Sequence, residues 1–308
     1  MTLTEQLVVP TTEPRVGSGA SHPAPRHRAI PAFVGLLPLV AYLLLFLVLP
    51  TILAITSGFF DADGGLTLTN LQGLGDPVIV ATFLNSAWIS LLTAVIGAVL
   101  GALACYAMIG LPAGSRVRSL VDAGAGVLAQ FGGVMLAFAF IATIGLQGLV
   151  TVFLRETFDF DLFANGAWIY GLPGLIPPYI YFQVPLMIIT FLPAVNALKP
   201  QWAEANLTLG GTRLSFWTRI GIPVLAPSFF ASLLLLFANA FSSYATAAAL
   251  ASQGSQIVPL QIRTALTSET LLGRENLAGA LALGMVVVMA VTMALYALIQ
   301  KRAARWQQ

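Results

Sequence analysis

Long apolar stretches alternate with short polar segments along almost the whole chain after residue 28. A helix needs about 20 mostly apolar residues to cross a bilayer. Uncharged runs long enough for such a helix cover residues 29–60, 77–115, 123–154, 162–198, 220–262 and 276–300. Trimming their polar or Pro/Gly-rich ends predicts six transmembrane helices, at roughly 33–58, 80–110, 127–150, 173–195, 225–250 and 277–300. The pattern therefore predicts an all-α integral membrane protein.

Two of these runs are longer than one span requires. In the fourth run, Pro173, Pro177 and Pro178 interrupt the beginning, which favours a short interfacial or re-entrant piece before one true span. The fifth run ends in the polar residues 252–256, which predict a loop.

One polar segment, Glu204 to Pro223, stands out between the apolar runs. The residues from Pro200 to Leu209 favour a short helix, because proline suits a first turn and the pair Gly210-Gly211 can end the helix in a left-handed conformation. Thr212 can then cap a second short helix that extends through Ile220. Pro223 lacks an amide hydrogen and is expected just inside the next membrane helix. The segment predicts two short helices at a membrane surface.

The spacing within this segment resembles the EAA loop of ABC-importer permeases. The matching positions are Glu204, Ala205, Asn206, Gly210, Ile220, Ile222 and Pro223. Asn206 and Ile222 depart from that pattern, which has alanine and leucine there, and asparagine is the weaker helix former at the first of these positions. An ordinary cytoplasmic loop, in which glycine and proline merely end helices, is the alternative interpretation.

The resemblance implies a type I ABC-importer permease with six transmembrane helices and both termini in the cytoplasm. It implies that the loop contacts a separate cytoplasmic ATPase through Glu204, Ala205, Gly210, Leu214, Trp217, Ile220 and Pro223. It further implies an ATPase dimer, a second permease subunit that is identical or paralogous, and an extracytoplasmic solute-binding protein. ATP and magnesium would bind the ATPase, so no cofactor is expected on this chain, and no nucleic acid is an expected partner.

The composition agrees with a membrane protein, since 58% of the residues are hydrophobic and 8% are charged, against about a quarter charged in soluble domains. We expect a disordered cytoplasmic tail at 1–28, one permease domain at 29–300 with its coupling loop at 200–223, and a C-terminal tail at 301–308. His22 and His27 lie in the first tail without partners for a metal site. The single cysteine, Cys105, allows no intramolecular disulfide.

Lysine and arginine concentrate in cytoplasmic loops of membrane proteins. With six spans and the N-terminus inside, the inner segments hold eleven of the fourteen basic residues: Arg15, Arg26, Arg28, Arg116, Arg118, Lys199, Arg213, Arg219, Lys301, Arg302 and Arg305. The outer segments hold Arg155, Arg263 and Arg274 among many carboxylates. This distribution predicts a multi-pass protein with both termini and the Glu204 loop in the cytoplasm. The resemblance to ABC-importer permeases further implies the plasma (inner) membrane of a prokaryote.

Polar uncharged residues inside the spans either bond to a neighbouring helix or line a water-filled path. The candidates for a translocation path are Gln130, Gln183, Asn239, Ser242, Ser243 and Tyr244. Gly97 and Gly101, four residues apart in the second span, are expected to serve close helix packing only.

Catalytic signatures are missing from the sequence. There is no phosphate-binding GxxxxGK[ST] loop, HExxH, CxxC or GxSxG arrangement, so we expect a non-catalytic subunit without a metal site. The spans also lack the chain of carboxylates or histidines that an ion-coupled carrier would use. A carrier or channel that needs no ATPase is the competing class, and a membrane scaffold without transport is the third.

The segments 241–247 and 258–263 resemble the spermidine/putrescine branch of these permeases, which also includes aminoethylphosphonate and ferric-iron importers. A polyamine or related organic cation is therefore the expected solute, with phosphonate, ferric iron or a sugar as alternatives. Phe241 and Tyr244 could contact a cation through their rings.

Overall fold

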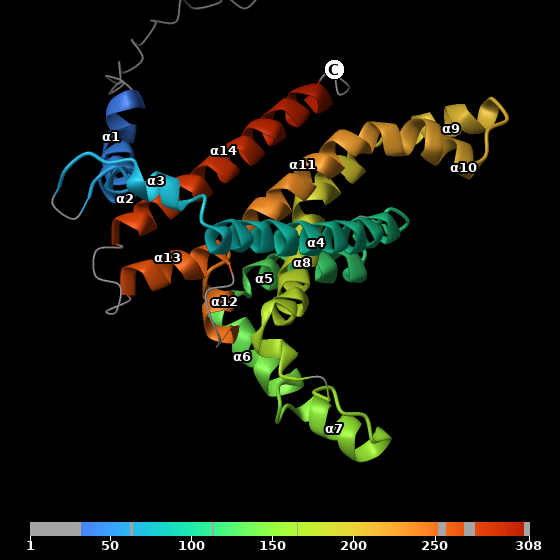
Figure 1. Cartoon of the computed structure of the whole chain (residues 1–308). Helices are drawn as coiled ribbons and strands as arrows, with labels where there is room; N and C mark the ends of the chain where they lie inside the picture. The colour runs from blue at the N-terminus through green and yellow to red at the C-terminus, as the bar shows by residue number, and fades with distance from the viewer. Residues whose placement is uncertain are drawn as a thin grey trace, which may run out of the picture. The chain divides into compact units, whose positions relative to one another are not determined.

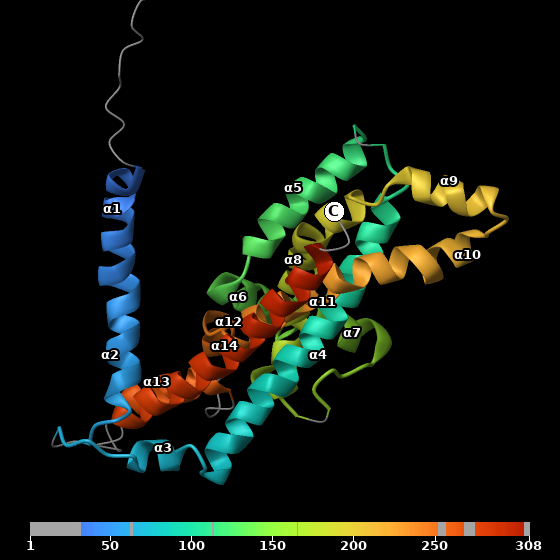
Figure 2. The same cartoon turned by 90° about the horizontal axis from the view of Figure 1, so that it is seen from above.

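The computed structural model describes residues 32–61, 64–112, 114–164, 166–251, 257–267 and 275–304. These residues form helices, apart from loops and an isolated bridge between Phe60 and Leu66 (Figures 1 and 2). Six of the helical segments are long and apolar enough to cross a membrane, which confirms the all-α membrane fold and the number of spans. The predicted tail at 1–28, the loop at 252–256 and residues 305–308 lie outside the described residues, whereas 301–304 continue the last helix.

The chain divides into two compact units, and the first ends at Pro50. Within it lie α1 (Ala32–Leu43) and a π-helical turn, η1 (Leu44–Val48), followed by the start of α2 (Leu49–Ser57). In the π turn, the Leu49 amide donates to the Leu44 carbonyl, five residues back. Residues 35–50 are apolar and exposed, as expected for a helix that lipid surrounds.

Three long helices form the core of the second unit: α4 (Pro77–Met108), α8 (Ile176–Asn196) and α11 (Ile222–Phe241). Asp76 caps α4 by accepting the Val78 amide at 2.8 Å, and the short helix α3 (Thr69–Gly73) precedes it. The last helix, α14 (Glu275–Ala304), packs along α11. Gly97 and Gly101 lie where α4 crosses α8, so the packing role predicted for them is confirmed.

The third span differs from the single helix predicted at 127–150. The structure has α5 (Arg116–Gln130), which packs on α8, then α6 (Gly133–Ile144) and α7 (Leu149–Phe158). Gly132 is extended and Gly133 has φ +70°, which separates α5 from α6. The segment from Gly145 to Gly148 then breaks the span. The prediction missed these breaks because apolar composition continues through them.

The fourth span follows the prediction, and the fifth does not. Two short 3₁₀ turns, η2 (Trp168–Tyr170) and η3 (Leu172–Leu175), precede α8, as the three prolines indicated. The fifth span, predicted at 225–250, ends as α11 at Phe241, and after Ser242–Tyr244 the short helix α12 (Ala245–Leu250) packs against α6. The amphipathic helix α13 (Val258–Thr267) then packs on α14.

Candidate functional site

Two short helices between α8 and α11 form the hairpin that the sequence predicted at this position. They are α9 (Pro200–Thr208) and α10 (Arg213–Phe216), and we call residues 200–221 the coupling hairpin. Figures 1 and 2 both show the two helices projecting together at one end of the second unit. At its tip, Gly210 has φ +76° and the Gly211 amide donates to the Asn206 carbonyl at 2.8 Å, which is the hydrogen bond of a Schellman motif.

A capping box begins α10. The Ser215 amide donates to Thr212 Oγ1 at 3.3 Å, and the Thr212 amide donates to Ser215 Oγ at 3.0 Å. The predicted cap at Thr212 is therefore confirmed, and it satisfies amides that the first turn of a helix leaves unpaired.

Asn206, which departs from the EAA pattern, joins the two arms of the hairpin. Its Nδ2 donates to the Thr212 carbonyl at 3.0 Å, and its Oδ1 accepts from Ser215 Oγ at 2.9 Å. A side chain on Gly211 would collide with the Asn206 amide group. The two hydrogen bonds of Asn206 hold α9 against α10, and this stabilisation offsets the lower helix propensity of asparagine. Gly211 has no side chain and so leaves space for the Asn206 amide group.

Replacing Asn206 with alanine should loosen the coupling hairpin while leaving the membrane helices folded. The substitution removes two hydrogen bonds worth about 1 kcal/mol each, partly offset by the better helix propensity of alanine. We expect amide hydrogen exchange to become several-fold faster at residues 211–216 and to stay unchanged in α8. Thr208→Ala is the matched control, because the Thr208 hydroxyl bonds only within α9. Unchanged exchange at 211–216 would contradict the bridging role.

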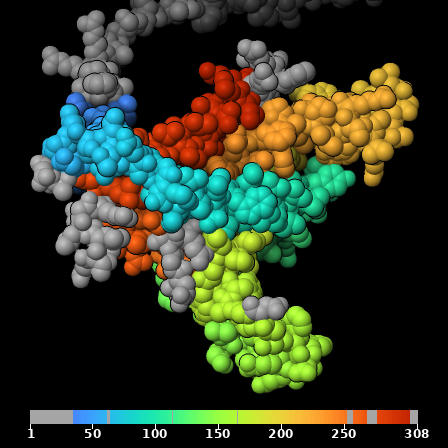
Figure 3. All heavy atoms as spheres, in the orientation of Figure 1, coloured from blue at the N-terminus to red at the C-terminus, as the bar shows by residue number. Residues whose placement is uncertain are grey.

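The coupling hairpin presents most of its predicted contact residues to the outside. Glu204, Ala205, Gly210 and Pro223 are exposed, and the Leu214 side chain is 73% exposed. Leu207 and Leu209 add further exposed apolar surface near the tip. The space-filling view shows this part of the chain extending beyond the helices around it (Figure 3). An exposed apolar patch next to charged groups is typical of a protein contact surface.

Trp217 lies against its own chain instead of pointing outward. Its ring is half-buried, with its centroid 5.1 Å from that of Tyr106 near the end of α4, in an edge-to-face arrangement. Gly221 lies under the same indole, where a β-carbon would come within 2.6 Å of the ring. A groove of about 580 Å³ runs beside it, between the end of α4 and the two arms of the hairpin. Trp217 therefore anchors the coupling hairpin to α4.

The hairpin also continues directly into the fifth span. After α10, the π-helical turn η4 (Trp217–Gly221) leads into α11 without a break, and Ile220 in it is half-buried. Pro223 lies in the first turn of α11, as predicted. A displacement of the hairpin can thus reach α11 through continuous helical backbone and α4 through the Trp217 ring.

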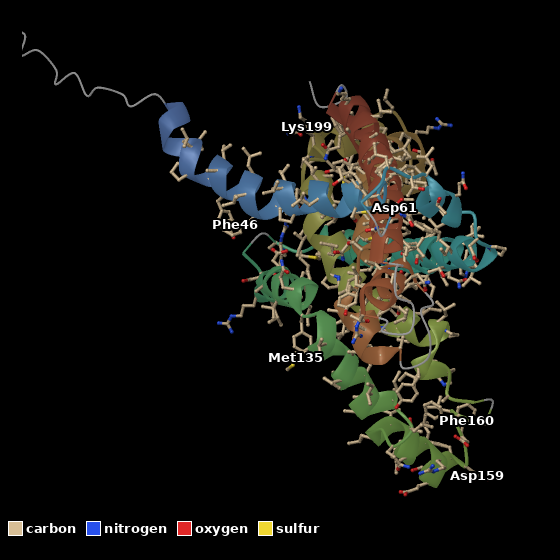
Figure 4. The ribbon with its side chains drawn as sticks, turned by 60° about the vertical axis from the view of Figure 1, so that its left-hand side comes forward. Phe46, Asp61, Met135, Asp159, Phe160 and Lys199 are labelled. Atoms are coloured by element: carbon tan, nitrogen blue, oxygen red, sulfur yellow. The ribbon has the colours of Figure 1, made fainter. Side chains whose placement is uncertain are left out.

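The charged loops lie at separate ends of the second unit. Lys199 precedes α9, and Asp159 follows α7 with φ 53°. Figure 4 shows the two labelled residues toward opposite ends of the unit. The two residues therefore lie on opposite sides of this unit, and the side that faces the cytoplasm stays a prediction from the basic residues.

The predicted path residues do not form one cluster. Ser242 and Tyr244, at the break after α11, line a groove of about 410 Å³ with Arg263 of α13. The Ser243 carbonyl accepts a hydrogen bond from the Tyr179 hydroxyl at 2.9 Å, which fixes the break to α8. Asn239 and Gln130 are exposed, the latter at the end of α5.

Gln183 is completely buried where α4, α8 and α11 meet. The side-chain amide is assigned in the orientation in which both its nitrogen and its oxygen have hydrogen-bond partners. In this orientation Nε2 donates to the Leu236 carbonyl at 3.1 Å, and Oε1 accepts from the Ala94 amide and the Thr93 hydroxyl, each at 3.0 Å. This placement favours an interhelical bond, the alternative that the sequence left open, because Gln183 reaches no open surface of the chain.

No family model matches the sequence, but several known proteins resemble it. The putative ferric transport system permease FbpB 1 of Haemophilus influenzae is 25% identical over 218 residues, which are 68% of this chain and 32% of that protein. The spermidine/putrescine permease PotC homolog of Mycoplasma genitalium is 34% identical over 88 residues, 27% of this chain and 31% of its own. The trehalose permease SugB of Mycobacterium tuberculosis is 28% identical over 244 residues, 77% and 78% of the two chains. The chain thus spans about a third of the length of the ferric permeases that it matches.

Solved structures resemble the chain over most of its length. A bacterial ABC transporter involved in the import of the acidic polysaccharide alginate superposes with a TM-score of 0.69 at 16% identity, covering 89% of this chain and 95% of the other. The same alginate transporter in complex with its pentasaccharide-bound periplasmic protein gives a TM-score of 0.68 at 17% identity. At this identity the likeness establishes the fold, which is that of an ABC-importer permease.

Proposed function

We propose that this chain is the membrane-spanning permease subunit of a prokaryotic ABC importer, in the cytoplasmic (inner) membrane with both termini inside. The observation that carries the proposal is the coupling hairpin: a Gly210 turn with φ +76°, an exposed apolar tip and an unbroken connection to α11. The fold and the sequence relatives support the same role.

In this role the chain catalyses no reaction. ATP and magnesium bind a separate cytoplasmic ATPase dimer, in whose surface the coupling hairpin docks. Exposed Leu214 enters that surface, Glu204 meets polar groups at its rim, and Gly210 permits the bend. Movement of the docked hairpin pulls α11 through η4 and pushes α4 through the contact between Trp217 and Tyr106. Because α4, α8 and α11 are packed around buried Gln183, the three helices move together and expose the path alternately to each side.

The remaining partners follow from the same role. A second permease subunit, identical or paralogous, encloses the path together with this chain. A solute-binding protein delivers the solute from outside, as the periplasmic protein does in the alginate complex.

The solute class is the finer part of the proposal. The Mycoplasma relative favours a polyamine over a short alignment, whereas the ferric and trehalose relatives favour ferric iron and a sugar. A polyamine would require carboxylates or aromatic faces along its route. Around the break after α11, the described lining provides Tyr244 and the positive Arg263 but no carboxylate, which disfavours a polycation there.

A pull-down from native membranes tests the role. The tagged chain, extracted in mild detergent, should bring with it an ATPase that carries a phosphate-binding loop, together with a permease and a solute-binding protein identified by mass spectrometry. Recovery of the chain alone, under conditions that preserve a known importer, would refute the proposal. Solute uptake by the purified chain in vesicles, driven by an ion gradient, would instead establish the carrier alternative.

A further inference from the structure

A third groove, distinct from the predicted path residues, lies between α8, α11 and α14. Its volume is about 560 Å³, within the usual range for small-molecule sites. Its polar lining comes from all three helices: Thr190, Ser228, Ser232, Tyr296 and Gln300. The groove stays open because three residues of its walls have small side chains: Ala194, Ala197 and Ala231. Thr190, Ser228, Tyr296 and Gln300 belong to the halves of their helices nearest the coupling hairpin or the end of α14, whereas Ser232 lies at the middle of α11.

Among the polar residues that line this groove, Ser228 and Ser232 are the two whose hydroxyls have no hydrogen bond to any described residue. The buried hydroxyls of Thr151 and Thr246 also lack a partner among the described residues, but neither residue lines the groove. Hydroxyls in membrane helices usually donate to the carbonyl four residues back, as Thr190 does to Leu186 at 3.0 Å and Thr292 does to Val288 at 2.9 Å. Within the part of the chain that the structure describes, neither serine hydroxyl has a hydrogen-bond partner. Ser232 is only 5% exposed and still lines the groove.

The opposite wall offers complementary groups. The Tyr296 hydroxyl accepts from Gln300 Nε2 at 2.6 Å, which leaves the Tyr296 proton and the Gln300 carbonyl oxygen available. The half-buried Tyr296 ring adds a flat apolar surface. No charged residue is among the described residues that line the groove.

Lipid is a poor occupant for such a groove. Acyl chains cannot pair with hydroxyls, and an unpaired polar group in an apolar medium costs at least about 1 kcal/mol. A charged solute would lack a counter-charge among the described lining residues, which is costly away from water. A neutral molecule with several hydroxyls can both donate to and accept from serine, tyrosine and glutamine side chains, and can place an apolar ring face on Tyr296.

We propose, building on the importer role above, that the groove between α8, α11 and α14 is a solute subsite of the translocation path and takes a neutral polyhydroxylated solute, a sugar or polyol. Ser228 and Ser232 donate to and accept from its hydroxyls on one wall, and Tyr296 with Gln300 does so on the other. The subsite extends from the middle of α11 toward the end that the importer role places in the cytoplasm, so it holds the solute on its way to release.

Cysteine protection tests the subsite in membranes that contain the whole transporter. The only native cysteine, Cys105, is completely buried, so a new cysteine reports without background. Ser232→Cys in inside-out vesicles is treated with a membrane-impermeant methanethiosulfonate, alone and with trehalose, sorbitol, spermidine or sulfate. The control for a sealed thiol is Ser90→Cys, at a serine that is 2% exposed in α4, and the control for a lipid-facing thiol is Val287→Cys, at an apolar position of α14 that is 52% exposed near the middle of the span.

We expect Ser232→Cys to react, both controls to stay unmodified, and trehalose or sorbitol to protect it. At ten times the half-protecting concentration, the rate should fall about tenfold. Spermidine and sulfate should not protect. An unreactive Ser232→Cys, protection by spermidine or sulfate, or no protection by either polyol would overturn the subsite. Recovery of the ATPase with the Ser232→Cys chain separates the two proposals. If the ATPase is recovered, a negative protection result rejects only the subsite. If no ATPase is recovered, the importer role itself is rejected.

Discussion

Replacing Gly210 with aspartate is expected to abolish solute uptake and to lower ATPase recovery with the tagged chain, while the chain stays inserted in the membrane. Apart from its two chain neighbours, no described residue comes within 4 Å of a β-carbon built at Gly210, so the substitution creates no clash among the described residues. Asparagine and aspartate also tolerate a positive φ better than other residues with side chains. The main loss therefore arises at the partner's surface, where the carboxylate would be buried without a counter-charge. Within this chain, the same charge would also oppose the dipole at the C-terminal end of α9.

The expected loss of binding free energy is that of a hot-spot residue in a protein–protein interface. A cost of about 2 kcal/mol or more corresponds to about a thirtyfold weaker complex. Gly210→Asn is the matched control, because it has the same size and the same backbone tolerance without the charge, and it should retain more ATPase. The measurement is ATPase recovered per inserted chain, with uptake by the same cells. Normal uptake and recovery for Gly210→Asp would contradict the assignment of the coupling hairpin.

Replacing Gly101 with leucine should prevent the second unit from folding. A β-carbon at Gly101 would lie 2.5 Å from Met187 Cβ and 2.9 Å from the Val184 carbonyl oxygen. At Gly97, one turn earlier, it would lie 2.6 Å from Gln183 Cβ. Both glycines thus allow α4 to approach α8 closely, and a side chain there would separate the two helices and the Gln183 network. Overpacking of this kind costs about 1–3 kcal/mol, occasionally more, and here backbone is one of the obstructing groups.

Membrane level and thermal unfolding in detergent measure this effect. Gly101→Leu should lower both strongly, with Gly101→Ala intermediate. Gly126→Leu is the matched control, because Gly126 also lies within a helix, α5, but has nothing within 4 Å of its β-carbon. It should be neutral or slightly stabilising, since leucine is the better helix former. Equal stability of Gly101→Leu and Gly126→Leu would show that α4 and α8 do not need this close approach.

The sequence by itself determined the six apolar segments and the coupling hairpin. Both follow from local chemistry. A run of apolar side chains is sufficient for a spanning helix. Asp76 and Thr212 cap helices by accepting hydrogen bonds from nearby amides, and Gly210 turns the chain with a positive φ that would strain most other residues. These interactions join residues only a few positions apart, so their signals can be read along the chain.

The tertiary structure decided what depends on residues far apart. Trp217 meets Tyr106 and Gln183 joins three helices, although neither partner can be recognised from spacing. The breaks in the third and fifth spans adjoin α6 and α12, which pack together, and the few polar residues and glycines at the breaks do not by themselves show that the helices end there. Ser232 is an ordinary polar residue in the sequence. Its hydroxyl can take part in the proposed solute subsite because α8 and α14 form a groove beside it. That groove depends on packing between helices that are far apart in the sequence.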